Sequence, residues 1–314
     1  MLGLTAGDGS FQWTAMASPV RLRLQGLSDE VALAIARAVR ADFAQTEQAL
    51  SRFRETAELA RLNAGLDRWT EVSGRLYAAL GAALRAGRRT AGLFDPRVLG
   101  SLEQYGYRGA PHAAPASCGP AVEAWLERRP RRRSVRLHVA ADLGGIGKGL
   151  GVRWGARIVG HLNVPFLLNA GGDLLAYGSG PDGRGWQIGV EDPTDPRRRI
   201  AALQLPLGGA VCTSSLARHH WRHDGQEVHH LIDPRTGRPG GAGLLAVTVV
   251  GKDPAWTEVW SKVLFLHGAT GIEHAAGQRA ALWVTDDGEL GMTARARQFV
   301  FWRDRPRHVS RTGA

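Results

Sequence analysis

The stretch HHLIDPRTGRPG, residues 229–240, places imidazoles, a carboxylate, a guanidinium and a hydroxyl within eight residues. Two prolines and two glycines punctuate it, a composition typical of a fixed turn. An imidazole titrates near neutral pH and can accept a proton from a hydroxyl group, while cationic side chains bind anionic groups. One loop therefore combines the means for acid–base and anion-binding chemistry.

A second candidate is DLGGIGKGLG, residues 142–151, which has four glycines in its first eight residues. Glycines let the backbone approach a ligand closely, and a following helix N-terminus together with Lys148 offers donors and positive charge to a phosphate. Gly149 stands where a P-loop needs Ser or Thr, and the spacing differs from the G-x-G-x-x-G of a Rossmann turn. NAGGDL, residues 169–174, is a further glycine-rich turn that alone is typical of a tight hairpin.

The cluster HHWRH holds His219, His220 and His223 at a spacing that could suggest a metal site. No cysteine or acidic residue stands at a matching spacing. We therefore do not expect a metal ion at these histidines.

Hydrophobic periodicity and turn residues predict the elements that carry these segments. Helices are expected from the cap Ser28 to about Leu62 with a break near Ser51, from about Trp69 to Gly87, from the glycine-rich segment to about His161, and over 255–267. Strands are expected at 20–27, 136–140, on both sides of 169–172, between 186 and 215, and at 244–251, with a late hairpin turned at 287–288. Long helices followed by a strand-rich remainder indicate an α+β fold.

The 314 residues, 44% of them hydrophobic, suffice for a substantial core. We assign residues 13–303 to a single domain of two lobes, with a candidate mobile insertion at 109–135. Residues 1–12 and 304–314 are expected to be flexible tails.

The net charge is +11, yet only three of the 40 basic residues are lysine. This bias, with abundant Ala and Gly, indicates G+C-rich coding rather than a nucleic-acid surface, and the run RRPRRR at 128–133 is expected to be a solvated loop. No leader pattern, lipid-acceptor cysteine or run of eighteen apolar residues is found. We therefore expect a cytoplasmic protein without a membrane span, in which Cys118 and Cys212 are ordinary thiols.

Eight segments, taken in order along the chain, resemble the ApbE-type FAD:protein FMN transferases. They are AMAS (15–18), SRFRETAELARLN (51–63), TAGLFDP (90–96), DLGGIGKG (142–149), NAGGD (169–173), TSS (213–215), HLIDPRTGRP (230–239) and TEVWSK (257–262). The resemblance implies an ApbE-like α+β fold, with largely antiparallel sheets and long N-terminal helices around a flavin-binding cleft. It also implies cleavage of the FAD pyrophosphate, attachment of FMN to a Ser or Thr hydroxyl of a target protein, and release of AMP.

Carried over by motif position, the resemblance implies that His230, rather than His229, is the general base and that Asp233 orients the loop or the base. Arg235 and Thr236 could contact phosphate or belong to a solvated turn. The residues implied to line the FAD pocket are Met16, Phe53, Leu93, Phe94, Asp95, Asp142, Lys148 and Ile232. Their chemistry agrees, because apolar and aromatic groups pack on flat rings, carboxylates accept from ring or ribose donors, and an ammonium binds phosphate.

The resemblance further implies a Mg²⁺ site built from a carboxylate, a hydroxyl four residues later, and backbone carbonyls of the glycine-rich segment, represented by Gly145. Glu258 and Lys262 stand at the two side-chain positions here, and a charged ammonium has no lone pair for a metal ion. Either Lys262 is a surface residue paired with Glu258 and the metal site is lost, or its charge stands where the cation would be and acts on the pyrophosphate. The scarcity of lysine favours the second explanation and a catalytic role for Lys262, since a planar guanidinium does not mimic a compact ammonium.

Smaller departures are Ala17-Ser18 for Gly-Thr, Phe53 for Tyr and Ser215 for Gly. Three functions follow from the sequence: FMN transfer to a protein, which we favour, FAD hydrolysis to FMN and AMP, and FAD binding without turnover. The sequence leaves open the target protein, the need for Mg²⁺ and the oligomeric state.

Overall fold

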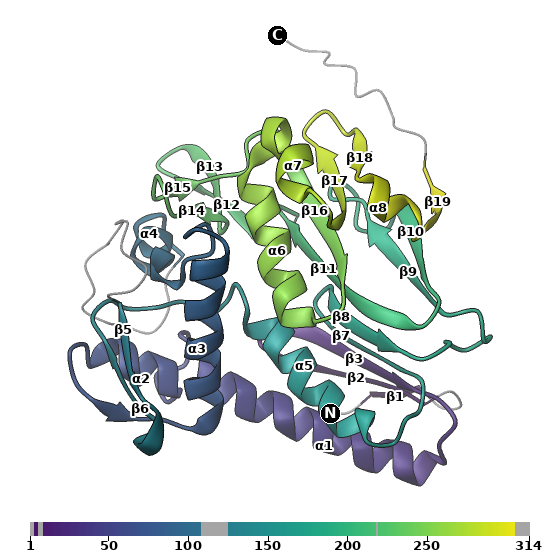
Figure 1. Cartoon of the computed structure of the whole chain (residues 1–314), viewed down its shortest axis with the longest axis horizontal. Helices are drawn as coiled ribbons and strands as arrows, with labels where there is room; N and C mark the ends of the chain where they lie inside the picture. Colours follow the sequence, from purple (N-terminus) through teal and green to yellow (C-terminus); the bar gives the residue numbers. More distant parts are fainter. Residues whose placement is uncertain (1–2, 6–8, 108–124, 218, 305–314) are drawn as a thin grey trace.

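A large antiparallel sheet forms the centre of the computed structural model, which describes residues 3–5, 9–107, 125–217 and 219–304 (Figure 1). Within these residues the sheet has nine strands in the order β1-β2-β3-β7-β8-β11-β16-β17-β18, each antiparallel to its neighbours. The strands are β1 (Gly3–Thr5), β2 (Ser10–Ala15), β3 (Ser18–Leu24), β7 (Phe166–Ala170), β8 (Asp173–Tyr177), β11 (Gly208–Ser215), β16 (Leu244–Gly251), β17 (Ala280–Thr285) and β18 (Leu290–Met292). Because β3 pairs with β7, the long segment between them leaves the sheet and returns beside its starting point.

Helices cover one face of this sheet. They are α1 (Asp29–Leu50), α5 (Gly147–Gly160), α6 (Pro254–Leu266) and α7 (Gly268–Ala276). The long α1 forms as predicted: Ser28 caps it by accepting from the Val31 amide at 3.5 Å, and the periodic residues Ile35, Val39 and Phe43 are buried. Its apolar stripe packs with α5 on β2, β3 and β7.

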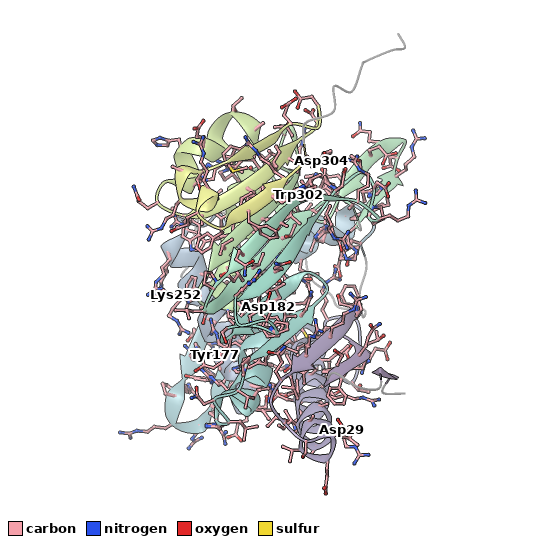
Figure 2. All side chains as sticks on the ribbon, turned by 90° about the vertical axis from the view of Figure 1, so that its right-hand side faces the viewer. Asp29, Tyr177, Asp182, Lys252, Trp302 and Asp304 are labelled. Atoms are coloured by element: carbon pink, nitrogen blue, oxygen red, sulfur yellow. The ribbon has the colours of Figure 1, made fainter. Side chains whose placement is uncertain are left out.

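A second, smaller sheet packs on the opposite face of the large one. It contains β9 (Trp186–Glu191), β10 (Arg199–Leu205) and β19 (Val300–Arg303) in the order β19-β10-β9. Alternate residues of β9, Trp186, Ile188 and Val190, point into the core between the sheets. In Figure 2, Trp302 on β19 lies at the opposite end of the molecule from Asp29 at the start of α1.

The segment between α1 and α5 forms a helical lobe beside the sheet (Figure 1). It comprises α2 (Glu58–Ala64), β4 (Thr70–Glu71), α3 (Gly74–Arg89), η1 (Pro96–Val98), α4 (Leu99–Gln104), β5 (Leu126–Arg129), η2 (Pro130–Arg132) and β6 (Ser134–Leu137). The second helix starts later than predicted because 70–71 pair with β6 and Ser73 caps α3. Of the candidate insertion 109–135, residues 125–135 belong to the hairpin β5–β6, and 109–124 lie outside the described residues.

The arginine run and the N-terminal segment differ from the predictions. The arginine run 128–133 is only partly solvated, because Arg128 lies over the Tyr77 ring at 4.0 Å. Residues 10–12, expected in a flexible tail, belong to β2, and Phe11 is buried. Cys212 is a buried free thiol whose pKa is raised by burial, while Cys118 lies outside the described residues.

The remaining elements are short: β12 (His220–His223) pairs with β13 (Gln226–His229), β14 (Ile232–Asp233) pairs with β15 (Arg238–Pro239), and α8 (Ala294–Arg297) precedes β19. None of the helices in the described part of the chain is long and apolar enough to cross a lipid bilayer.

Gly149 allows α5 and α6 to pack closely, since a Cβ there would lie 2.6 Å from both Ala255 Cα and the Pro254 carbonyl oxygen. We expect Gly149→Ala to lower the free energy of unfolding by about 1–3 kcal/mol, as overpacking does. Urea denaturation followed by circular dichroism measures the change. The matched control is Gly160→Ala in the same helix, where no atom lies within 4 Å of the added methyl group; equal destabilisation by both variants would contradict the packing explanation.

Candidate active site

The site is built around the start of α5, where the loop 142–146 turns into the helix. The amides of Ile146 and Gly147 donate to the Leu143 carbonyl at 3.1 and 2.8 Å, which closes this turn. Gly145 is required by close contacts, because a Cβ would lie 2.8 Å from the Phe94 ring and 3.3 Å from Lys262 Cδ. The loop, the Phe94 segment and α6 therefore meet at one point.

The hairpin turn between β2 and β3 brings Met16 to the same helix. Met16 and Ala17 have φ of 52° and 54°, which matches the type I′ geometry of a two-residue hairpin. A Cβ on Gly147 would lie 3.4 Å from Met16 Cε, and one on Gly171 would lie 2.7 Å from Ser18 Oγ. Ala17 thus adopts a left-handed backbone conformation, which strains a residue that has a Cβ. The glycine that the family pattern has at this position would adopt it without strain.

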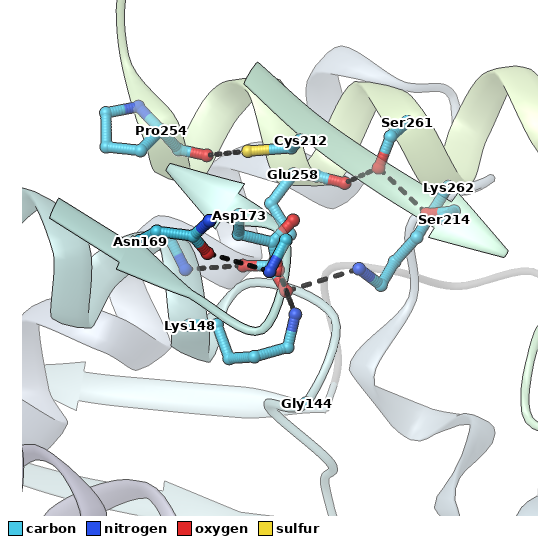
Figure 3. A network of polar contacts seen from close by, with 12 residues as sticks. Gly144, Lys148, Asn169, Asp173, Cys212, Ser214, Pro254, Glu258, Ser261 and Lys262 are labelled. Atoms are coloured by element: carbon cyan, nitrogen blue, oxygen red, sulfur yellow. Dashed lines mark hydrogen bonds and ion pairs between the residues drawn. The ribbon is translucent and has the colours of Figure 1, made fainter. Parts of the chain in front are cut away.

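Four charged side chains form a compact network at the start of α5 (Figure 3). Lys148 is hydrogen-bonded to Asp173, and its Nζ lies 3.6 Å from Glu258 Oε1. Lys262 donates to the same Oε1 at 3.2 Å, and the amide of Gly149 donates to Glu258 Oε2 at 2.7 Å. The two carboxylates are 1% and 0% exposed, whereas the lysine side chains are 26% and 18% exposed.

Asp173 and Glu258 are thus more deeply buried than the ammonium groups of Lys148 and Lys262, which separate the two carboxylates from solvent. Burial lowers the pKa of Lys148, and the carboxylate of Glu258 opposes this shift. Lys262 is paired with Glu258 at i,i+4, as expected if it were a surface residue that replaced a lost metal site. Its side chain nevertheless lines a cavity and does not face the outer surface.

Asp142 is fixed by contacts from distant segments. Its carboxylate accepts from the Gly144 amide at 2.5 Å and is paired with the buried Arg52. The Asp142 amide donates to the Pro96 carbonyl at 2.8 Å, and Asn63 clamps the backbone of Ala141 with two hydrogen bonds of 2.9 Å. The carboxylate is thus already oriented before any ligand binds.

Asp95 and Phe94 are held by local turns. Asp95 caps η1 by accepting from the Arg97 amide at 2.9 Å, and its carboxylate also binds the Arg97 side chain. Thr90 Oγ1 accepts from the Phe94 amide at 3.0 Å. Both segments therefore present their side chains on a rigid backbone.

His230 and His229 have different surroundings. His230 lies in the cavity against the ring of His219 at 4.9 Å, and its Nδ1 lies 3.3 Å from the His219 carbonyl oxygen. A carbonyl only accepts, so this contact requires Nδ1 to carry the proton and leaves the lone pair on Nε2. His229 packs on Phe265, and its Nδ1 accepts from the Leu231 amide at 3.2 Å.

The carboxylate of Asp233 contacts its own loop. Its carboxylate accepts from the Arg235 amide at 2.9 Å and pairs with the Arg235 guanidinium at 2.7 Å. Its carbonyl accepts from the Gly237 amide at 2.8 Å. Among the described residues Asp233 makes no hydrogen bond to His230, so of its two predicted tasks the geometry supports only the first.

One cavity of about 1070 Å³ joins these groups. Its lining includes all eight residues expected to contact FAD, together with three expected at the reacting centre: Met16, Phe53, Leu93, Phe94, Asp95, Asp142, Lys148, Ile232, Gly145, His230 and Lys262. Asp233 and Glu258 lie behind this lining. The cavity also extends along β9, which the sequence did not single out.

Several residues of the site were not predicted. Arg52 and Arg97 hold the two expected carboxylates, Asn63 positions the loop, and Asp173 binds Lys148. Asn63 and Asp173 end two of the matched motifs, so their positions were the available signal.

The residues present do not fit a Mg²⁺ ion. Both oxygens of Glu258 already accept from N–H donors, and Lys262 supplies donors only. In the described part of the chain, no three His, Cys, Asp or Glu side chains are grouped so that they could hold a metal ion.

The histidine pair gives the fold a defined pH dependence. Burial, His219 and the charge of Lys262 lower the pKa of His230 to about 3, and burial lowers the pKa of His229 to about 4. In the unfolded chain each takes up a proton near pH 6.5, so the free energy of unfolding must fall as pH drops below about 6.5. Between pH 7 and pH 5 we expect His230 alone to account for about 1–2 kcal/mol of this loss.

Denaturant unfolding of the wild type and of His230→Gln at these two pH values measures the contribution. The variant should lose less stability on acidification than the wild type. The exposed His274→Gln on α7 is the control and should follow the wild type. An acid sensitivity that is identical in all three proteins would show that His230 does not remain neutral in the fold.

Comparison with known proteins gives one consistent result. The sequence profile of the ApbE family matches residues 16–283. The chain is 24% identical over 299 residues to the FAD:protein FMN transferase of Klebsiella pneumoniae, covering 89% of this chain and 85% of that one. It is 23% identical over 271 residues to the FAD:protein FMN transferase of Escherichia coli K12, covering 81% and 77%.

Solved structures agree with the fold. The ApbE protein of Thermotoga maritima superimposes with a TM-score of 0.80 at 25% identity, covering 92% of this chain and 98% of that one. The flavin transferase ApbE of Vibrio cholerae does so with a TM-score of 0.74 at 21% identity, covering the same shares, which is a likeness of fold. The predicted α+β architecture with largely antiparallel sheets is thereby confirmed.

Proposed function

Since this chain belongs to the ApbE family, we propose that it is an FAD:protein FMN transferase, which moves FMN from FAD to a Ser or Thr hydroxyl of a target protein. Its curated relatives carry this name. The observation that carries the proposal is the single cavity that joins His230, Lys148, Lys262 and Asp142 to a set of apolar side chains. Its volume of about 1070 Å³ suits a ligand larger than a mononucleotide.

The proposed reaction is a phosphoryl-type transfer. The hydroxyl oxygen of the target attacks the phosphorus on the FMN side of the pyrophosphate and forms a P–O bond. The bond from that phosphorus to the bridging oxygen breaks, and AMP leaves with the electron pair. The hydroxyl proton goes to Nε2 of His230, whose lone pair is free because Nδ1 donates to the His219 carbonyl.

The other residues bind and orient FAD in this proposal. Lys148 and Lys262 stabilise charge on the diphosphate, since charge stabilisation and positioning supply most of the catalysis in such transfers. Phe53, Leu93 and Phe94 provide apolar surface for flat rings, and the oriented Asp142 accepts from a ring or ribose donor. Asp233 holds the loop that presents His230.

A mass measurement tests the proposal. The chain is incubated with FAD and a peptide or domain that carries a Ser or Thr flavinylation motif, and a matched target with Ala at the acceptor position is the control. We expect the target to gain the mass of one FMN and the control to remain unmodified. Free FMN and AMP with an unmodified target would indicate hydrolysis instead, and intact bound FAD would indicate binding without turnover.

A further inference from the structure

We propose that the ammonium group of Lys262 takes the place of a divalent cation, so that this chain binds and cleaves FAD without a metal ion. The inference rests on the proposed function, which it extends to the question of what neutralises the diphosphate. Figure 3 shows Lys262 with Glu258, Lys148 and Asp173.

Lys262 reaches the reacting centre from α6. Its aliphatic chain lies against the glycine-rich loop, where Cδ is 3.3 Å from the position of a Cβ on Gly145. Its Nζ binds Glu258, and its charge is close enough to His230 to lower the pKa of that imidazole. The ammonium therefore lies in the lining of the cavity that also contains Gly145 and His230.

Glu258 has no free oxygen for a metal ion. One carboxylate oxygen accepts from the Gly149 amide at 2.7 Å, and the other lies 3.2 Å from Lys262 Nζ and 3.6 Å from Lys148 Nζ. A divalent cation at this carboxylate would have to displace two ammonium groups and would be repelled by both. The positions that could hold a cation are thus occupied by cations of the chain itself.

The charges are arranged in two layers. Asp173 and Glu258 are buried, and Lys148 and Lys262 stand in front of them, toward the cavity. An ammonium has three N–H donors, and the described contacts of Lys262 use one of them. The cavity side of the network therefore presents positive charge and N–H donors, which is what a diphosphate requires.

Residue type supports the same conclusion. Only three of the 40 basic residues are lysine, and two of them, Lys148 and Lys262, share Glu258 in this cavity, while Lys252 is exposed. A guanidinium is larger and planar, so it does not replace a compact ion. A lysine is the side chain that most nearly occupies the position of a bound cation.

The first test uses the purified full chain and metal alone. Mn²⁺, followed by electron paramagnetic resonance, and Mg²⁺, followed by calorimetry, are titrated into the wild type with and without FAD. We expect no stoichiometric site, and we expect the FAD dissociation constant in EDTA to lie within about twofold of its value in MgCl₂. One Mn²⁺ or Mg²⁺ bound per chain, or FAD affinity that EDTA lowers tenfold or more and Mg²⁺ restores, would overturn the inference.

The second test removes the charge. Lys262→Met is unbranched and keeps most of the length of the side chain, and we expect it to weaken FAD binding about tenfold, with or without Mg²⁺. Lys252→Met, the same change at an exposed lysine, is the control and should leave FAD affinity unchanged. A folded Lys262→Met protein with wild-type FAD affinity contradicts the inference. Since binding is measured, these outcomes are independent of whether the chain transfers FMN, hydrolyses FAD or only binds it.

Discussion

Replacing His230 with glutamine is expected to slow FMN transfer by about 10²- to 10⁴-fold, the usual contribution of a positioned general base. Glutamine preserves much of the volume of the ring and can donate to the His219 carbonyl, but it cannot take a proton from the target hydroxyl. FAD affinity should change little, because in the proposed function the cationic lysines, rather than the neutral imidazole, bind the diphosphate. Transfer is measured as the rate at which the target gains FMN, with FAD affinity measured in parallel.

His229→Gln is the informative companion variant. His229 packs on Phe265 outside the cavity lining, so its loss should change the transfer rate far less than the loss of His230. The assignment of the base is wrong if His229→Gln abolishes transfer while His230→Gln does not. A parallel loss of FAD affinity in His230→Gln would instead identify a binding role.

The elements that could be predicted are those whose signals are local. The helix α1 was predicted from its cap and periodicity, and the hairpin β7–β8 from the turn 169–172, because both depend on residues near in sequence. The start of α3 was predicted too early, at Trp69. Residues 70–71 instead pair with β6, a distant strand, and the helix begins after its cap Ser73. The packing of β9 and β10 on the far face of the main sheet has no local signal.

The same division holds in the site. Motif positions placed all eight expected FAD contacts and His230 around one cavity. They did not reveal Arg52, whose pairing with Asp142 joins positions 90 residues apart and depends on the whole lobe between α1 and α5. They also left the two explanations for Lys262 open, because only the fold shows that its i,i+4 pair with Glu258 faces the cavity.

Glu258→Ala is expected to lower the free energy of unfolding by about 3–5 kcal/mol, as when one partner of a buried ionic network is removed. Glu258 is 0% exposed and neutralises Lys262 and, in part, Lys148, while its other oxygen accepts from the Gly149 amide. Its loss leaves an ammonium and a helix N–H without their partner in a buried setting. Urea denaturation of the protein without FAD measures the change.

The double variant Glu258→Gln with Lys262→Met distinguishes an unbalanced charge from a simple packing defect. Glutamine keeps an oxygen for the Gly149 amide, and methionine removes the ammonium that the lost carboxylate would leave unpaired. If charge balance dominates, the double variant should be more stable than the sum of the two single variants predicts, by about 1 kcal/mol or more. Two results would contradict this explanation: strictly additive changes in the free energy of unfolding, or a loss below about 1 kcal/mol in Glu258→Ala. Either would mean that water already screens the network. The charges facing the cavity would then contribute to ligand binding without stabilising the fold.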